Sequence, residues 1–263
     1  SRHPTSWTSL EIRPMIKHYR IHEVSEYIDW IYFFHAWGFS PRKTQTPEAI
    51  LLLQEAKEML EQLDKNFQTH AVLRLMDANS EENDIWIEGT RFPFLRQQTA
   101  KEEEPYLCLS DFIRPSSSKI TDKIGLFATT VDAEMEQLYT EDPYLHMLVK
   151  TLADRLAEAT AEKTHDTIRK EFQGIRPAVG YPSLPDQSVN FLLDELLDMQ
   201  QIGIHLTENG MMQPHASVSG LMLAHPASRY FNIGKIDEEQ LQDYASRRKL
   251  PVQLMRKFLA ANL

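Results

Sequence analysis

Residues 174–182 of this 263-residue chain read GIRPAVGYP. Pro177 and Pro182 restrict φ to about −65°, whereas Gly180 can adopt a positive φ, so the segment is suited to one unusual backbone path. It is predicted to be a stiff turn rather than a helix or a strand. Arg176 lies inside the turn, and a guanidinium with a fixed position suits bidentate recognition of a carboxylate or a phosphate. From the pattern alone, a solvated arginine in a surface loop is an equal alternative.

Helix signals lie on both sides of this turn. Thr46 as N-cap and Pro47 at the first helical position begin a run of good helix formers that continues to Asn66, which predicts a long helix. A second long helix is predicted from about Pro143 to Phe172, shortly before the turn. Shorter helices are predicted from Val24 to near Gly38, with an interruption of the pattern at Asp29 and Trp30, from Ser188 to about Gln201, and after Asp237 with a break at Pro251.

Short apolar runs predict strands that come in antiparallel pairs. Residues 71–77 and 85–89 flank a polar turn at 79–84 and predict a hairpin. The runs YLCLSDFIRP (106–115) and IGLFATTV (124–131) predict two more strands, and ASVSGLMLAHPASRYFNIGKI (216–236) predicts a second hairpin. Because strands do not alternate with helices, we predict a single α+β domain over 1–263, with a twisted, mostly antiparallel sheet flanked by helices and an N-terminal extension at 1–20.

Composition excludes several classes of partner. A net charge of −10, from 38 acidic and 28 basic residues, argues against nucleic acid, whose binding needs a basic surface. No apolar run approaches the roughly 20 residues of a membrane helix, so we expect no membrane partner. The single cysteine, Cys108, excludes an internal disulfide framework, and the first residues lack the apolar stretch of a signal peptide. These features predict a cytoplasmic location.

Three residues are candidates for metal ligands or for a nucleophile. His18 and His22 are four residues apart, as metal ligands on one helical face would be, but no third ligand follows in that stretch. Solvated histidines are therefore the preferred interpretation, and we predict no metal site. Cys108 lies in an apolar run, which is typical of a core cysteine. The common motifs of serine hydrolases, zinc peptidases, P-loop proteins and Rossmann folds are absent.

Two acidic residues have both a structural and a functional interpretation. Asp29 lies among aromatic residues, where burial of a carboxylate would require a cationic or hydrogen-bonding partner. An exposed position on an amphipathic helix is the alternative. Glu158 follows Arg155 by three residues, which is the spacing of an ordinary surface ion pair.

Motifs from distant parts of the chain occur together in a recognisable order. They are YIDW (27–30) with FF (33–34), QGIRPAVGYP (173–182), ASVSG (216–220) and HPASRYF (225–231). Together they resemble the activation domain of cobalamin-dependent methionine synthase, which binds S-adenosylmethionine through an R-x-x-x-G-Y turn. The resemblance covers nearly the whole chain, with further landmarks at DKIGLFA (122–128) and VKTLADRLAEATAE (149–162). It implies the α+β fold of that domain.

The resemblance implies a role for each residue of the turn. Arg176 would hold the methionyl carboxylate of S-adenosylmethionine. Ala178 and Gly180 would let the main chain run along the ligand, and Tyr181 would complete the turn.

The same resemblance implies binding residues outside the turn. Asp29 and Glu158 match acidic positions of the family and would face the ammonium and sulfonium groups. Charge pairing with the ligand would offset their partial burial. Tyr230 and Phe231 match the pair that contacts adenosine.

In this family the module restores an enzyme whose cofactor has become cob(II)alamin. A flavodoxin-like donor supplies one electron, and the methyl group of S-adenosylmethionine traps the resulting cob(I)alamin. The resemblance therefore implies two cofactors, S-adenosylmethionine and cobalamin, and two partners, a cobalamin-binding methionine synthase chain or domain and a flavodoxin-like donor. Cobalamin would be carried by that partner, because the D-x-H-x-x-G signature is absent here. Cobalt is the nucleophile, so we expect positioning of the methyl donor and no catalytic side chain.

Two functions remain open from the sequence. The first is reactivation of methionine synthase, by a separate subunit or by a module of a longer enzyme; the short segment THDTIRKEFQ (164–173) before the turn favours a separate subunit. The second is a diverged, non-catalytic module that binds S-adenosylmethionine or docks to a partner. Leu221 and Met222 bear on this choice, since they stand where the family favours aromatic residues that could face cobalamin.

Overall fold

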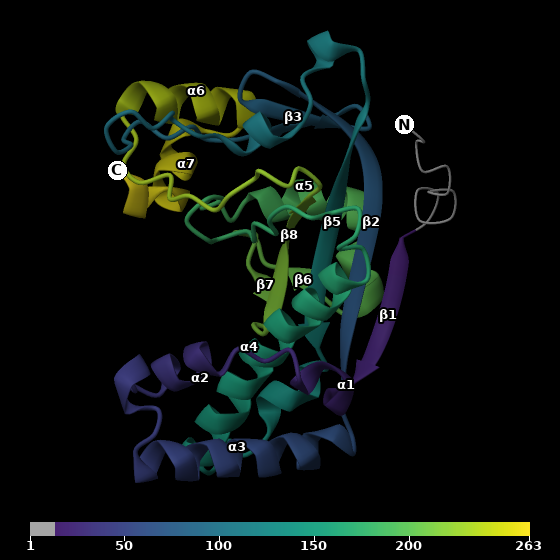
Figure 1. Cartoon of the computed structure of the whole chain (residues 1–263), viewed down its shortest axis with the longest axis vertical. Coiled ribbons are helices and arrows are strands. Elements are labelled where there is room, and N and C mark those ends of the chain that lie inside the picture. Colours follow the sequence, from purple (N-terminus) through teal and green to yellow (C-terminus); the bar gives the residue numbers. More distant parts are fainter. Residues whose placement is uncertain (1–13) are drawn as a thin grey trace.

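The longest strand of the protein, β2 (Gln68–Glu81), organises the sheet (Figure 1). In the computed structural model, which describes residues 14–263, one edge of β2 pairs with β5 (Asp122–Val131) along almost its whole length. Its other edge is shared by β1 (Met15–Arg20) near the start of β2 and β3 (Asp84–Ile87) near its end.

The remaining strands complete an antiparallel sheet. β4 (Thr90–Pro93) pairs with β3, and β8 (Ser217–Leu223) pairs with the outer edge of β5. The order is β4-β3-β2-β5-β8, with β1 beside β2. β6 (His205–Leu206) and β7 (Met212–Gln213) form a small separate hairpin. Because every pair is antiparallel, the predicted α+β fold with a mostly antiparallel sheet is confirmed.

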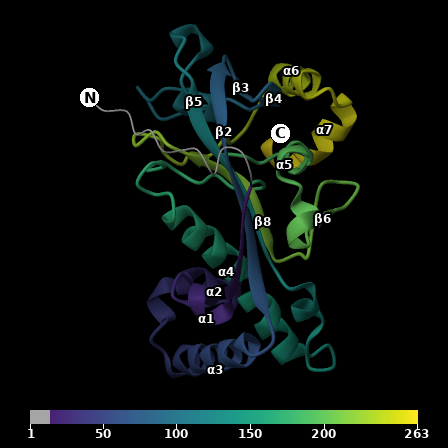
Figure 2. The same cartoon turned by 90° about the vertical axis from the view of Figure 1, so that its right-hand side faces the viewer.

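Helices cover both faces of the sheet (Figure 2). Along β2, side chains alternate between the two faces: Val72 belongs to the core cluster that contains Leu193 of α5, and Leu73 to the cluster that contains Ala157 of α4. The helices are α1 (Ile21–Ser25), α2 (Trp30–Ala36), α3 (Pro47–Asp64), α4 (Pro143–Asp166), α5 (Val189–Leu197), α6 (Glu238–Arg248) and α7 (Val252–Phe258). This double cover explains why β5 and β8 are buried almost throughout.

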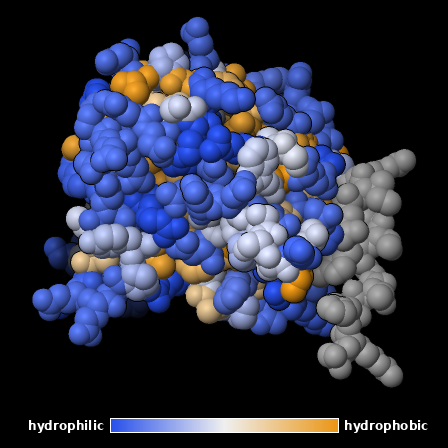
Figure 3. All heavy atoms as spheres, turned by 90° about the horizontal axis from the view of Figure 1, so that it is seen from above, coloured by the Kyte–Doolittle hydropathy of each residue, from blue (hydrophilic) through white to orange (hydrophobic). Residues whose placement is uncertain are grey.

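The two ends of the sheet carry different helices. α1, α2 and α3 pack with α4 at the lower end of Figure 1 around an aromatic cluster that includes Phe33 and Phe34. α6 and α7 pack at the opposite end, next to β4. Seen from above, the surface is mostly hydrophilic (Figure 3). Within residues 14–263, no helix combines the length and the apolar character that a membrane span needs.

Local signals define the helix starts as predicted. The Thr46 side chain accepts a hydrogen bond from the amide of Ala49 at the start of α3, and Asp237 caps α6 through the amide of Gln240. Pro47 and Pro143 occupy first-turn positions of α3 and α4, where the missing N–H costs nothing. α4 ends at Asp166, earlier than predicted, and residues 167–171 continue as turns.

The region from Val24 to Gly38, predicted as helical with an interruption at Asp29 and Trp30, contains two helices rather than one. α1 ends at Ser25, and Asp29 adopts an extended conformation and caps α2 by accepting a hydrogen bond of 3.0 Å from the amide of Ile31. The apolar spacing continues across the break because both helices bury one face in the same core. Met15–Arg20, placed in the N-terminal extension from the sequence, form β1.

Two of the predicted strands are also wrong. Residues 106–115 make two isolated bridges, at Cys108 and Pro115, and a short 3-10 helix, since Asp111 accepts from the amide of Cys108 and ion-pairs with Arg96. The second predicted hairpin forms only its first strand, β8, and residues 225–237 are irregular. The first predicted hairpin is confirmed as β2–β3, although the turn is confined to Glu82 and Asn83.

Candidate functional site

The segment 174–181 runs along the outer edge of β8, in the place that the predicted second hairpin strand would need. Four backbone hydrogen bonds hold it there. The amide of Gly174 donates to the carbonyl of Leu223 (3.0 Å), and the amide of Leu223 donates to the carbonyl of Ile175 (2.9 Å). Leu221 donates to the carbonyl of Pro177 (3.0 Å), and Val179 donates to that of Ser219 (2.9 Å). We call residues 174–181 the strap. It leaves β8 at Gly180, whose φ of +90° is the positive value expected from the sequence.

Gly220 on β8 makes this close approach feasible. A Cβ at this position would overlap the carbonyl oxygen of Pro177 and lie 2.9 Å from Cα of Ala178. Ala178, within the strap, is buried in the core cluster on the α4 face, and its side chain therefore anchors the strap to the core. The ASVSG motif therefore has a structural reason: its glycine gives the strap room to lie against the sheet.

Two side chains of the strap contact one face of α4. The Tyr181 hydroxyl donates to the carboxylate of Glu158, and Nη1 of Arg176 lies 2.7 Å from Oε2 of Glu162. Glu158 and Glu162 are one helical turn apart, so both contacts lie on the same side of the helix. Burial of the hydroxyl and the neighbouring Glu158 charge raise the pKa of Tyr181, which therefore remains a hydrogen-bond donor at neutral pH.

Arg176 is largely enclosed, with 14% of its side chain exposed. Its backbone N–H donates to the hydroxyl of Tyr230 at 2.9 Å. The structure thus brings Tyr230, predicted from a distant motif, beside the strap. Phe231 lies differently: it is partly buried and packs against Phe112, with 6.4 Å between ring centroids, in the core on the α5 face.

Asp29 lies at the α1–α2 junction and is exposed. The tyrosines on either side of it both contact α4: the Tyr27 hydroxyl bonds to Asp166 (3.3 Å), and Tyr32 lies 5.5 Å below the guanidinium of Arg155. Asp29 is therefore held next to α4. The expectation that its carboxylate is partly buried among aromatic rings is wrong, because the helix cap directs it to the surface. Glu158, in contrast, is half-buried as expected.

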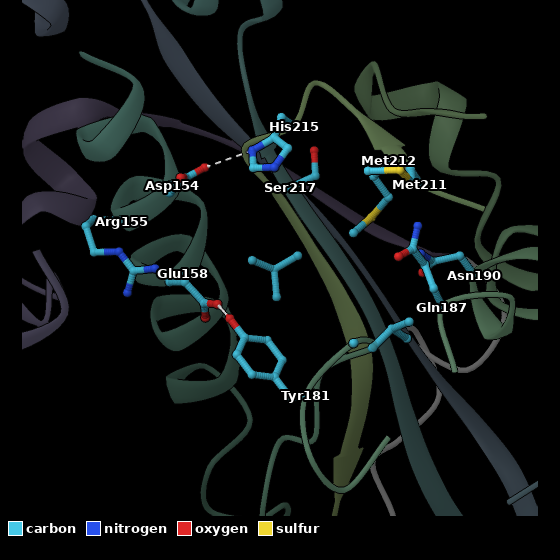
Figure 4. A pocket seen from close by; sticks show the side chains of 13 residues that line it. Asp154, Arg155, Glu158, Tyr181, Gln187, Asn190, Met211, Met212, His215 and Ser217 are labelled. Carbon is cyan, nitrogen blue, oxygen red and sulfur yellow. Dashed lines mark hydrogen bonds and ion pairs between the residues drawn. The ribbon is translucent and has the colours of Figure 1, made fainter. Parts of the chain in front are cut away.

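A pocket of about 350 Å³ opens where the strap meets α4 (Figure 4). Of the eight predicted binding residues, it contains Glu158, Gly180 and Tyr181. The opposite wall comes from α5 and the β6–β7 hairpin. Pocket residues that the sequence interpretation missed include Asp154, Asn190, Met211, Met212, His215 and Ser217. Its size lies within the range of small-molecule sites.

Polar contacts shape this pocket. His215 and Asp154 face each other across one side, with 3.5 Å between Nδ1 and Oδ1. Burial raises the pKa of Asp154, although the neighbouring His215 acts in the opposite direction. On the other side, buried Asn190 donates to the carbonyl of Gly210 and accepts from the Ser219 hydroxyl, and so ties the β6–β7 hairpin to β8.

Other residues singled out from the sequence lie elsewhere. His18 is in β1 and contacts His70 across the sheet, whereas His22 starts α1 and contacts Asp64, so the two do not share a helical face. No three His, Cys, Asp or Glu side chains in the described part of the chain are arranged to hold a metal ion. Cys108 is a core residue as predicted, and burial raises the pKa of its thiol.

Leu221 and Met222 are fully buried, one on each face of β8. Both side chains therefore belong to the core of this protein and not to its surface.

Comparisons with known proteins identify the family and the fold. The family model described as "Vitamin B12 dependent methionine synthase, activation domain" matches residues 20–249. Among solved structures, the MetH reactivation domain bound to AdoHcy is similar with a TM-score of 0.87 and 34% sequence identity. The alignment covers 95% of this chain and 90% of that chain. With a match over most of its length, the chain belongs to the activation-domain family of vitamin B12-dependent methionine synthase.

Proposed function

We propose that this protein binds S-adenosylmethionine along α4 and the strap, and supports the reductive methylation of cobalamin held by a methionine synthase chain or domain. The observation that carries the proposal is the strap itself, an R-x-x-x-G-Y segment fixed against β8 with its arginine and tyrosine on one face of α4. The similarity to a reactivation domain solved with AdoHcy supports the same ligand class.

The charges along this face suit the ligand. S-adenosylmethionine carries a carboxylate beside an ammonium and a sulfonium, and the face offers a guanidinium at Arg176 with carboxylates at Glu158 and Asp29. We assign the ligand carboxylate to Arg176 and the cationic groups to the two acids. Tyr230, next to Arg176, is assigned to the adenosine, together with main-chain groups at Ala178 and Gly180.

Phe231 is the least direct of the proposed contacts. Its ring is committed to the core beside Phe112. A contact with adenosine would therefore use its main chain, whereas exposed Tyr230 can offer its ring.

The proposed reaction takes one electron and one methyl group. Cob(II)alamin accepts an electron from a flavodoxin-like donor, and the cob(I)alamin formed takes the methyl group, which leaves methylcobalamin and S-adenosylhomocysteine. A sulfonium is a good leaving group, so the contribution of this chain is to bind and orient the donor. Tyr181 of the strap and Glu158 of α4 both line the pocket. A methyl group held near them would therefore face the pocket, from which an acceptor can approach.

The proposed partners are a cobalamin-binding methionine synthase chain or domain and a flavodoxin-like donor. The B12-dependent family supports the first of these partners. We also propose a cytoplasmic location, in keeping with a single, unpaired cysteine.

The first test is calorimetric titration of the chain with S-adenosylmethionine. Arg176→Ala should weaken binding about 10- to 100-fold, because a charge-assisted hydrogen bond to a carboxylate is lost. Arg42→Ala, which removes an exposed arginine remote from the strap in sequence, is the matched control and should bind as the wild type does. Equal affinity of Arg176→Ala and wild type would contradict the assignment of the strap.

A second measurement separates reactivation from a non-catalytic role. The chain is mixed with a cobalamin-binding methionine synthase fragment, a one-electron reductant and S-adenosylmethionine, and methylcobalamin is followed by its absorbance. Formation that depends on this chain supports reactivation. Binding of S-adenosylmethionine without methylcobalamin formation would identify the diverged, non-catalytic module instead.

A further inference from the structure

Arg176 is anchored from one side only. Its Nη1 group donates to Oε2 of Glu162 at 2.7 Å and lies 3.5 Å from Nδ1 of His165. Hydrogen-bond partners for Nε and Nη2 are absent among residues 14–263. These two groups form the edge of a guanidinium that binds a carboxylate through two parallel hydrogen bonds.

Glu162 is itself held in place from the opposite side. Its second oxygen, Oε1, accepts from Nη2 of Arg169 at 2.5 Å, and Nε of Arg169 contacts Asp166 at 3.1 Å. The carboxylate therefore bridges two arginines and uses one oxygen for each. A bridging carboxylate with both oxygens engaged is less free to change rotamer than one in a single ion pair, so it defines where Nη1 of Arg176 lies.

His165 supplies the second contact to the same nitrogen. It is buried, and its Nε2 lies 2.9 Å from the carbonyl of Phe172, which can only accept a hydrogen bond. Nε2 must therefore carry the proton, which leaves the lone pair of Nδ1 directed at Arg176. Burial, with the charges of Arg169 and Arg176, lowers the pKa of His165 and keeps this neutral tautomer at neutral pH.

We propose that Glu162 and His165 are positioning residues, which fix Nη1 of Arg176 so that its Nε and Nη2 edge is presented to the carboxylate of the ligand. This inference rests on the proposed binding of S-adenosylmethionine. It adds residues of α4 that never touch the ligand and act through Arg176. The alternative is that the Glu162 carboxylate competes with the ligand carboxylate for Arg176 and must be displaced before the ligand binds. In that case replacement of Glu162 would raise the affinity for the ligand instead of lowering it.

The test uses two ligands that differ at the group concerned. S-adenosylmethionine carries the aminocarboxyl group, and 5′-methylthioadenosine lacks it. Affinities of both are measured by calorimetry for the wild type, for Glu162→Gln, and for Glu171→Gln as a control. Glu162 is 42% exposed, so the variant is expected to fold, and Glu171 is an exposed acid nearby whose replacement makes the same change in net charge.

Glu162→Gln should bind S-adenosylmethionine about 10-fold more weakly, because the ion pair that orients Arg176 is replaced by a weaker hydrogen bond to a neutral amide. Its affinity for 5′-methylthioadenosine should equal that of wild type, and Glu171→Gln should change neither affinity. An equal loss for both ligands would indicate general damage to the site and would overturn the positioning role.

Unchanged or tighter binding of S-adenosylmethionine by Glu162→Gln would also overturn the inference, and tighter binding would identify Glu162 as a competitor. In both cases the proposed function stands as long as the wild type binds. If the wild type fails to bind S-adenosylmethionine, the proposed function fails and the positioning role falls with it.

Discussion

Replacement of Gly220 by alanine tests whether the strap needs to lie against β8. The added methyl group would overlap the Pro177 carbonyl oxygen and lie 2.9 Å from Cα of Ala178, whereas real Cβ contacts essentially never fall below 3.0 Å. Both obstacles are backbone atoms, so the strap must move away. Two of its hydrogen bonds to β8, from the Leu221 amide to the Pro177 carbonyl and from the Val179 amide to the Ser219 carbonyl, would then be strained or lost.

Two backbone hydrogen bonds at about 1 kcal/mol each, with an overpacking cost of about 1 kcal/mol, give a destabilisation of about 3 kcal/mol. Displacement of Arg176 and Tyr181 should also weaken the binding of S-adenosylmethionine by about 100-fold, the effect of misplacing a positioning group by about 1 Å. Chemical denaturation gives the free energy of unfolding, and calorimetry gives the affinity.

Gly89→Ala is the matched control for this prediction. Gly89 has a φ of +84° in the β3–β4 turn, and a Cβ there meets no atom within 4 Å. Its replacement should cost about 1 to 2 kcal/mol from backbone strain and leave ligand affinity unchanged. If Gly220→Ala loses no more stability than Gly89→Ala and binds the ligand normally, the strap does not depend on the close approach, and our account of the ASVSG motif is refuted.

Two further predictions concern α4. Asp142→Ala should lower the free energy of unfolding by about 1 kcal/mol, because Asp142 accepts hydrogen bonds from the amides of Tyr144 and Leu145 at the start of the helix. Chemical denaturation of this variant and of the control Glu141→Ala measures the difference. Equal stabilities of the two variants would contradict the capping role of Asp142. His165 has a pKa below its usual 6.5 in the folded state, so below that pH the unfolded chain binds a proton that the folded chain does not. Stability of the wild type should therefore fall, relative to His165→Gln, as the pH is lowered from 7.5 through 6.5, and parallel pH profiles of the two proteins would show that His165 is not held neutral.

The sequence predicted those parts of the fold that depend on neighbours along the chain. Thr46 and Asp237 cap helices through amides only three residues away, and Gly180 takes a positive φ because of its own backbone. Such features are local, so a short window of sequence contains all the groups involved.

Features that depend on competition between distant segments were not predictable in this way. Residues 225–231 have the composition of a strand, but the edge of β8 that they would need is taken by the strap. Asp29 was noted for its aromatic neighbours and as an interruption of the helical pattern, but its role as the cap of a second helix was not predicted. Asp154 precedes Glu158 by one helical turn, and this spacing could have placed both in the pocket.

The remaining residues of the pocket had no comparable signal. Met211, His215 and Asn190 come from the β6–β7 region and α5, and only the tertiary fold brings them opposite α4. The resemblance to a family drew attention to residues 174–181, but it indicated nothing about this opposite wall.

The strap also closes an edge of the sheet. The amides of Leu221 and Leu223 on β8 would otherwise be unpaired and could pair with a strand of another molecule. The outer side of the strap does not offer a new edge in turn: its Ile175 and Arg176 amides donate to the hydroxyls of Ser228 and Tyr230, and Pro177 has no amide hydrogen to offer. The same short segment that we assign to ligand binding thus protects the protein from intermolecular strand pairing, so variants that release it should aggregate as well as lose their ligand.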